Sequence, residues 1–235
     1  MKIVAMSDIH GYLPPDVPEC DVVCICGDIL PLSIQRDIIT SVSWLVSDFK
    51  TWAENLPCKK VIFIAGKHDI IFEYLNNPLG TKSSVIANRI FQAKHLVDSK
   101  LVYLMDSEYV FEGVKFYGIP WVPDFYDWAF YASSAELVDI FNKIPADTDV
   151  LMTYCPPRHG EMATILQESS RRHGVEYGSK ELADVLNHHN IKYNICGHIH
   201  SGSHEPYVIN NTTCVNVCIK DENFKPVHKP FMFEL

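Results

Sequence analysis

Three apolar runs near the start of the chain each end in polar residues. They cover residues 3–6, 21–26 and 60–65 and consist mainly of aliphatic side chains. Runs of this length and composition are typical of strands buried on both faces of a parallel sheet. Between the second and third runs, apolar residues from Ile34 to Leu56 recur every three or four positions, which predicts a helix that Ser33 caps and Pro57 ends. This helix would return the chain to a parallel strand.

The rest of the chain carries the signals of a second sheet. Residues 70–98 are expected to be mostly helical and irregular. From 101 to 121 the β-branched and aromatic content rises, and Glu112-Gly113 is placed where a hairpin turn would start the second sheet. Further strands are predicted at 149–153, 193–196, 207–209, 213–217 and 230–234, the last three completing that sheet.

Two more helices are predicted between those strands. Ser133 and Glu136 form a capping box for a short helix that Pro145 ends, and a second helix lies near 179–189. Together the patterns predict an α/β fold in which two mixed β-sheets pack as a sandwich flanked by helices. No repeat, low-complexity tract or long linker interrupts residues 1–235, so we expect one domain.

Composition narrows the class of protein. The net charge of −9 disfavours a protein that binds extended nucleic acid through a basic surface. No apolar run is long enough to span a membrane, and Met1-Lys2 leads directly into a strand, so we expect a soluble, cytoplasmic protein. The eight cysteines suit that compartment, where thiols stay reduced.

The cysteines do not form a recognisable zinc motif. Cys24, Cys26 and Cys196 lie within apolar strand-like runs and are expected in the core. A structural zinc site built from the cysteines at 20–26, or from Cys214 and Cys218, is an alternative, but neither set has the Cys-x-x-Cys spacing.

Polar clusters follow five of the predicted strands. These are Asp8 and His10, Asp28, Lys67-His68-Asp69, Tyr154, and His198 with His200. Side chains two apart on a strand point the same way, so an Asp-x-His or His-x-His pair can converge on one cation. Carboxylates and imidazoles together suit Mn, Fe or Zn better than Mg or Ca, which prefer oxygen ligands. The sequence therefore predicts a transition-metal site at the ends of these strands.

The ordered set resembles the calcineurin-like metallophosphoesterases. Their pattern is Asp-x-His, Gly-Asp, Gly-Asn-His-Asp, a Thr-His before a Pro-Pro loop, and Gly-His-x-His. Here the same order is met by 8–10, 27–28, 66–69, 153–157 and 197–200. The match covers nearly the whole chain, and the ending resembles the small metallophosphoesterase-domain proteins. The resemblance implies a four-layer αββα fold with a binuclear metal centre that hydrolyses phosphomonoesters or phosphodiesters.

The resemblance also implies roles for individual residues. Asp8, His10, Asp28 and His200 would hold the first ion, and Asp28 would bridge to a second ion that His198 also ligates. His68 would protonate the leaving oxygen, and Asp69 would orient or polarise His68. Two such cations bind a hydroxide that attacks phosphorus and clamp the phosphate.

Two positions depart from the family pattern, and both belong to the second ion. Lys67 replaces a ligating Asn and Tyr154 replaces a ligating His. A protonated lysine has no lone pair to donate, and tyrosine ligates only as phenolate. We therefore expect one tightly bound divalent ion, with the ammonium of Lys67 paired with Asp28 in place of the second.

Two functions are compatible with these residues. The first is a phosphodiesterase-like hydrolase that acts on a small phosphodiester or nucleotide. Arg158 and His159 are candidate phosphate-binding residues, the alternative being that they lie in a solvated loop. The alternative is a catalytically impaired member of the fold that binds a nucleotide or phosphate or acts as a regulatory module. The altered second-ion position favours the alternative, whereas retention of His68 and Asp69 favours the enzyme.

Overall fold

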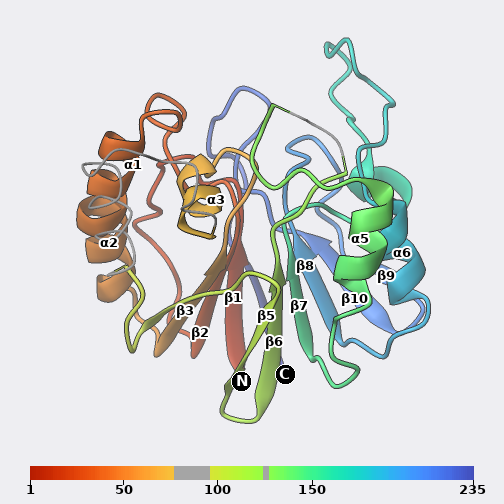
Figure 1. Cartoon of the computed structure of the whole chain (residues 1–235), viewed down its shortest axis with the longest axis horizontal. Helices are drawn as coiled ribbons and strands as arrows, with labels where there is room; N and C mark the ends of the chain where they lie inside the picture. The colour runs from red at the N-terminus through yellow and green to blue at the C-terminus, as the bar shows by residue number, and fades with distance from the viewer. Residues whose placement is uncertain (77–95, 124–126) are drawn as a thin grey trace.

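Two β-sheets packed face to face form the centre of the computed structural model, which describes residues 1–76, 96–123 and 127–235 (Figure 1). The first sheet has five strands in the order β11-β1-β2-β3-β4, and the second has six in the order β5-β6-β7-β8-β10-β9. The strands are β1 (Lys2–Met6), β2 (Val22–Cys26), β3 (Lys60–Ile64), β4 (Leu101–Tyr103), β5 (Ser107–Phe111), β6 (Val114–Ile119), β7 (Val150–Thr153), β8 (Tyr193–Cys196), β9 (Tyr207–Ile209), β10 (Thr212–Asn216) and β11 (Phe231–Glu234).

Both sheets are mixed, with parallel centres. Strands β1 to β4 run parallel, and β11 joins β1 antiparallel at one edge. In the second sheet β6, β7, β8 and β10 run parallel, while β5 and β9 form antiparallel edges. The parallel strands of each sheet end on the same side, and this brings the polar residues that follow them together.

Alternation along the strands divides the core into three apolar clusters. In β1, Ile3 and Ala5 face the second sheet, whereas Val4 and Met6 pack against helices on the outside. Both sets are fully buried, so β1 is a continuous apolar run instead of an alternating one.

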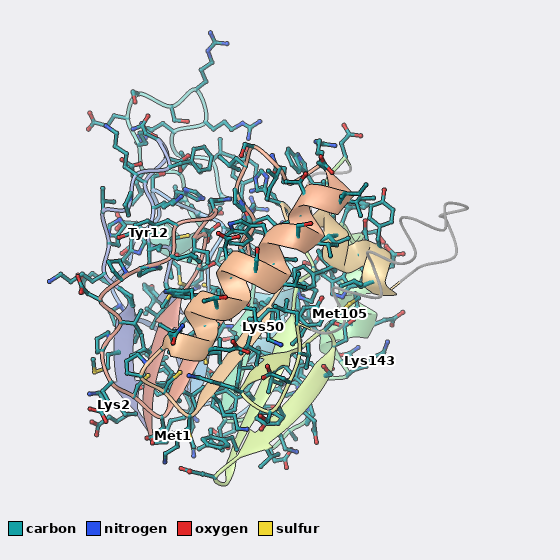
Figure 2. All side chains as sticks on the ribbon, turned by 90° about the vertical axis from the view of Figure 1, so that its left-hand side faces the viewer. Met1, Lys2, Tyr12, Lys50, Met105 and Lys143 are labelled. Carbon is teal, nitrogen blue, oxygen red and sulfur yellow. The ribbon has the colours of Figure 1, made fainter. Side chains whose placement is uncertain are left out.

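Helices cover the outer face of each sheet and complete four layers. The helices α1 (Ile38–Trp44), η1 (Leu45–Phe49, a π-helical turn), α2 (Lys50–Asn55) and α3 (Ile70–Asn76) lie on the first sheet. The helices α5 (Ser134–Phe141) and α6 (Lys180–Leu186) lie on the second, and a short 3₁₀ turn, η3 (Gly160–Ala163), precedes α6. Figure 2 shows the continuous rod of α1, η1 and α2, with Lys50 at the start of α2, crossing in front of the first sheet. This arrangement confirms the predicted two-sheet α/β sandwich.

The first helix starts later than the sequence predicted. The expectation that Ser33 caps it is wrong, because the N-cap is Asp37. The Asp37 carboxylate accepts hydrogen bonds from the backbone amides of Ile39 and Thr40 and from the Thr40 hydroxyl. A carboxylate that satisfies two otherwise unpaired amides stabilises this start over one at Ser33.

Two strands belong to the first sheet and not to the second. Strand β4 pairs parallel with β3, and β11, which was expected to complete the second sheet, pairs with β1. Phe233 of β11 extends the core between the sheets, and the Leu235 amide donates to the Met1 carbonyl oxygen. Pairing between strands more than 200 residues apart leaves no mark on the local pattern that identifies a strand.

Two features formed by hydrogen bonds within a short stretch of chain were predicted correctly. The hairpin between β5 and β6 turns at Glu112 and Gly113, both with positive φ, and Ser133 with Glu136 forms the capping box of α5. Helix α5 ends at Phe141, before Pro145. Of the region 70–98, α3 is described, whereas residues 77–95 lie outside the described residues. Within the described ranges, no helix combines the length and apolar character needed to cross a membrane.

Candidate metal centre

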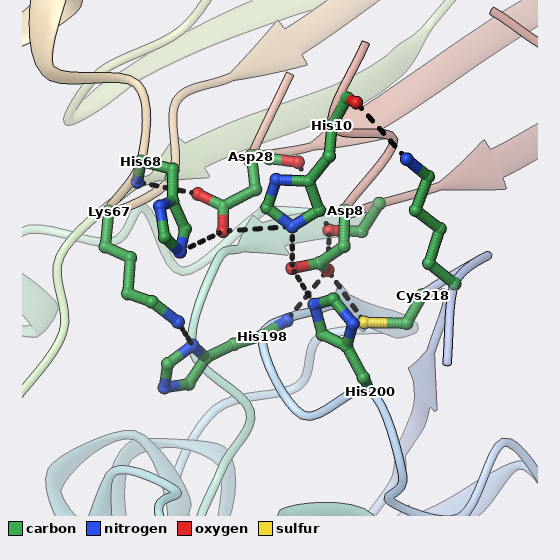
Figure 3. Close-up of polar contacts among 12 residues, drawn as sticks. Asp8, His10, Asp28, Lys67, His68, His198, His200 and Cys218 are labelled. Carbon is green, nitrogen blue, oxygen red and sulfur yellow. Dashed lines mark hydrogen bonds and ion pairs between the residues drawn. The ribbon is translucent and has the colours of Figure 1, made fainter. Parts of the chain in front are cut away.

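The polar residues that follow the parallel strands gather at one end of the sandwich (Figure 3). Four of them have left-handed backbone conformations, with φ of 55° at Asp8, 39° at His10, 51° at Asp28 and 75° at His198. Such values are uncommon for residues other than glycine and cost free energy that the surrounding fold must supply. Four of the nine non-glycine residues with positive φ in the described part of the chain lie in this cluster, which indicates a functional site.

Asp8, His10 and Asp28 present ligating atoms within 4.8 Å of one another. The Nε2 atom of His10 lies 3.6 Å from Oδ2 of Asp28 and 4.0 Å from Oδ1 of Asp8. All three side chains are inaccessible to solvent. Within the described part of the chain, Oδ1 of Asp8 and both ring nitrogens of His10 have no hydrogen-bond partner. Buried polar atoms without partners are costly, and a cation between these groups would satisfy them.

His200 completes this group from the opposite sheet. Its Nδ1 atom donates to the Asp221 carbonyl oxygen at 2.9 Å, which leaves Nε2 facing Oδ1 of Asp8 at 3.3 Å. An unprotonated Nε2 would present its lone pair to a carboxylate, so either a proton or a cation must lie between them. Burial alone would lower the pKa of His200, but Asp8 raises it. A backbone carbonyl on the far nitrogen is the usual support of a metal-ligating imidazole.

The other oxygen of Asp8 is held by the protein. Its Oδ2 atom accepts from the Ser7 hydroxyl at 2.6 Å, from the His198 amide at 2.9 Å and from the Cys218 thiol at 2.7 Å. Burial opposes ionisation of Asp8, but the close contact with His200 and the charge of that imidazole hold the pKa of Asp8 well below the usual value. Cys218 was predicted only as an alternative zinc ligand with Cys214, because its contact with Asp8 joins residues 210 positions apart.

The residues expected around a second ion contact one another directly. The Tyr154 hydroxyl donates to Oδ2 of Asp28 at 2.6 Å and lies 3.1 Å from Nδ1 of His198. Nζ of Lys67 lies 3.0 Å from the same Nδ1 atom. Lys67 therefore contacts His198, and the contact with Asp28 that was expected of Lys67 is made by Tyr154. Burial and the nearby Lys67 charge lower the pKa of His198 well below its usual value, while burial and Asp28 raise that of Tyr154.

His68 borders the cluster, but Asp69 does not orient it. Nε2 of His68 lies 3.8 Å from Oδ2 of Asp28, and its Nδ1 contacts Oε1 of Gln35. Asp69, expected to orient His68, instead accepts hydrogen bonds from the amides of Ile29, Leu30 and Gly66. A fully buried carboxylate that joins the turns after β2 and β3 supports the backbone of the site, and Gln35 contacts the imidazole in its place.

A cavity of about 340 Å³ opens beside the cluster. It is lined by Lys67, His68, Trp128, Ile165, Arg172, Tyr177, His198, Ile199, His200, Glu222 and Phe224. The aromatic lining residues pack on the site: the Trp128 ring lies 4.3 Å from that of His68, and the Phe224 ring lies 5.1 Å from that of His10. None of these aromatic neighbours was singled out from the sequence, because the loops that carry them have no local pattern tied to metal sites.

Arg158 and His159 are not brought to this cavity. Arg158 is paired with Glu176 at 3.1 Å, and the His159 ring packs against Tyr207 at 4.6 Å. The arginine that lines the cavity is Arg172. The arginine beside the cluster is thus Arg172 and not Arg158, because the folded path of the loop 155–178 decides which arginine faces the cavity. Phosphate binding by Arg158 and His159 stays a prediction.

The chain is similar to known proteins along its whole length. The family model for calcineurin-like phosphoesterases matches residues 1–202. Metallophosphoesterase domain-containing protein 1 of Homo sapiens is 28% identical over 244 residues, covering 100% of this chain and 71% of that protein. An uncharacterised protein of Methanocaldococcus jannaschii is 27% identical, covering 92% of this chain and 87% of that one.

Solved structures support the same fold. The phosphopantetheinyl hydrolase of Mycobacterium tuberculosis superposes with a TM-score of 0.55 at 14% identity, over 94% of this chain and 90% of that one. Another solved structure gives a TM-score of 0.59 at 17% identity, over 92% and 89% of the two chains. At these identities the structures show the fold alone. With the family model covering most of the sequence, the chain belongs to the calcineurin-like phosphoesterases.

Proposed function

We propose that this protein is a metal-dependent phosphoesterase that hydrolyses a small phosphodiester or nucleotide. The observation that carries the proposal is the convergence of Asp8, His10, Asp28 and His200, with partnerless ligating atoms at its centre. These four residues would hold one divalent ion. Two carboxylates and two imidazoles suit manganese, iron or zinc. When bound, such an ion neutralises phosphate charge and activates water at neutral pH.

His68 is the residue we assign to protonate the leaving oxygen. It lines the cavity beside the cluster, and its contact with Gln35 through Nδ1 leaves Nε2 directed toward the site. Burial lowers the pKa of His68, with the negative charge of Asp28 opposing this effect. A bound phosphate anion would add a second negative charge near the ring and favour its protonated form.

The cavity lining supports an organic phosphate as the substrate. Lys67 and Arg172 supply positive charge, and the ring faces of Trp128 and Phe224 supply flat apolar surface. Glu222 also lines the cavity, and it disfavours a highly charged anion such as a phosphomonoester dianion. A phosphodiester, with a single negative charge and two organic substituents, fits this lining best.

A second function is favoured by a specific observation. Tyr154 and Lys67 contact the residues that would otherwise ligate a second ion, which is the change expected of a protein that binds a phosphate compound without turning it over. This alternative predicts ligand binding without hydrolysis, so turnover separates the two.

The test uses protein purified without chelator. Hydrolysis of bis(p-nitrophenyl) phosphate should disappear after treatment with EDTA and return when Mn²⁺ is added. His200→Ala should abolish it, while His188→Ala, which removes an exposed imidazole at the end of α6, should not. Absence of metal-dependent hydrolysis of this and of other phosphodiesters, with ion and ligand bound, would favour the binding protein.

A further inference from the structure

The space between Asp28 and His198 is filled by the chain itself. These are the two second-ion residues that the sequence retains, and the Tyr154 hydroxyl lies within hydrogen-bond distance of both, at 2.6 Å from Oδ2 of Asp28 and 3.1 Å from Nδ1 of His198. Both Asp28 and Tyr154 are fully buried. An ion that ligated both atoms would have to occupy the place of the phenol oxygen.

The Tyr154 ring is held in place by two glycines. A Cβ atom added to Gly27 would lie 2.6 Å from Cδ2 of Tyr154, and one added to Gly66 would lie 2.7 Å from its Cε2. Only glycine allows the ring to fit against both turns. The backbone on either side is also fixed, because the Tyr154 amide donates to the Ile119 carbonyl and the Tyr154 carbonyl accepts from the Gly197 amide. Tyr154 is therefore part of the packed core and cannot be displaced without disturbing β7.

In this arrangement hydrogen bonds occupy the atoms of Asp28 and His198 that face the second-ion position. A distance of 2.6 Å between phenol and carboxylate oxygens requires the phenol proton, so Tyr154 is a donor to Asp28 and not a phenolate ligand. An ammonium group can only donate hydrogen bonds, so Lys67 donates to Nδ1 of His198. This hydrogen bond occupies the lone pair of Nδ1. The second-ion residues of the family do not fit an ion here.

We propose that the metal centre of this protein holds a single ion and that the ammonium of Lys67 replaces the second as a fixed positive charge. Lys67 lines the cavity beside His68 and His200, where it can contact a phosphate oxygen. The single-ion inference stands on the contacts above, whereas the phosphate-binding role of Lys67 rests on the proposed function.

The number of ions bound per chain tests the single-ion centre directly. The purified protein is loaded with excess Mn²⁺, freed of unbound ion, and measured by elemental analysis and by electron paramagnetic resonance. One ion per chain with the spectrum of isolated Mn²⁺ is expected. Two ions per chain, or the spectrum of an exchange-coupled pair, would overturn the inference and leave the proposed phosphoesterase function standing. No bound ion would overturn both.

A pair of variants tests whether Lys67 and Tyr154 prevent the binding of a second ion. Lys67→Asn combined with Tyr154→His restores the family residues and should raise the count from one to two. Tyr154→Phe is the matched control, because it keeps the ring and Lys67 and should stay at one. A folded double variant that still binds one ion would overturn the assignment of these two residues; if it does not fold, the count for the unaltered protein still decides.

Inhibition by inorganic phosphate tests the role of Lys67. Lys67→Met removes the charge and should weaken inhibition about 10- to 100-fold. This is the usual loss of affinity when a hydrogen bond to a charged group is removed. Lys192→Met is the control, since Lys192 pairs with Asp149 and does not line the cavity. Unchanged inhibition in Lys67→Met would overturn this role. One bound ion without turnover of any phosphodiester would instead overturn the proposed function and leave the single-ion centre standing.

Discussion

Neutralising Asp28 should strongly weaken metal binding, because it removes one of the two buried carboxylate charges of the site. Asp28→Asn keeps the shape of the side chain and tolerates the positive φ of 51° at this position, so it removes the charge together with one hydrogen-bond acceptor. One elementary charge about 4 Å from a divalent ion is worth roughly 8 kcal/mol at an effective dielectric constant near 20. If desolvation offsets half of this, about 4 kcal/mol is lost, which weakens binding by about 1,000-fold.

Thermal unfolding with and without Mn²⁺ measures this loss. At an ion concentration 1,000 times the dissociation constant, binding stabilises the unaltered protein by about 4.1 kcal/mol, which raises Tm by about 8–16 °C for a chain of this size. Asp28→Asn at the same concentration should gain only about 0.4 kcal/mol, or about 1 °C.

A half-buried carboxylate outside the metal centre provides the control. Asp106 also has positive φ, 46°, and accepts hydrogen bonds from the Trp121 indole, outside the metal centre. Asp106→Asn should keep the full metal-dependent rise in Tm. An equal rise in Asp28→Asn and in the unaltered protein would refute the assignment of Asp28 as a ligand.

Three further predictions concern two residues that line the cavity and a glycine in the turn after β3. His68→Ala should slow hydrolysis of an alkyl phosphodiester by about 10²- to 10⁴-fold and of an activated aryl ester much less, with the ion content unchanged; equal slowing of both esters would argue against a proton donor. Arg172→Ala should raise KM about 10-fold or more in steady-state assays, whereas Arg158→Ala should leave KM unchanged; the reverse result would favour Arg158, the candidate named from the sequence. Gly66→Ala should lower the free energy of unfolding by about 1–3 kcal/mol in urea, because its Cβ would lie 2.4 Å from Oδ1 of Asp28; unchanged stability would show that the turn can relax.

The part of the site that the sequence could predict is the part carried by local pattern. Asp8 and Asp28 follow apolar runs, and such runs become central parallel strands whose ends meet. The hairpin at Glu112-Gly113 and the capping box at Ser133 are equally local, since each is fixed by residues within four positions of one another. These features could be predicted because the interactions that form them lie within a short stretch of chain.

Contacts between distant segments could not be predicted in this way. Cys218 contacts Asp8 across 210 residues, and β11 pairs with β1 across the whole chain. The hydrogen bonds of Asp69 were missed for a related reason. Its partners are backbone amides, which every residue except proline has, so no sequence pattern identifies them. Which arginine faces the cavity likewise depends on the path of the loop that holds Arg172.

Stepwise addition of Mn²⁺ to metal-free protein, with hydrolysis of bis(p-nitrophenyl) phosphate recorded at each step, tests the central claim most directly. If one ion held by Asp8, His10, Asp28 and His200 supports hydrolysis, the rate should rise in proportion to added ion and level off at one equivalent per chain. No hydrolysis at any ratio, although the ion is bound, would contradict the claim.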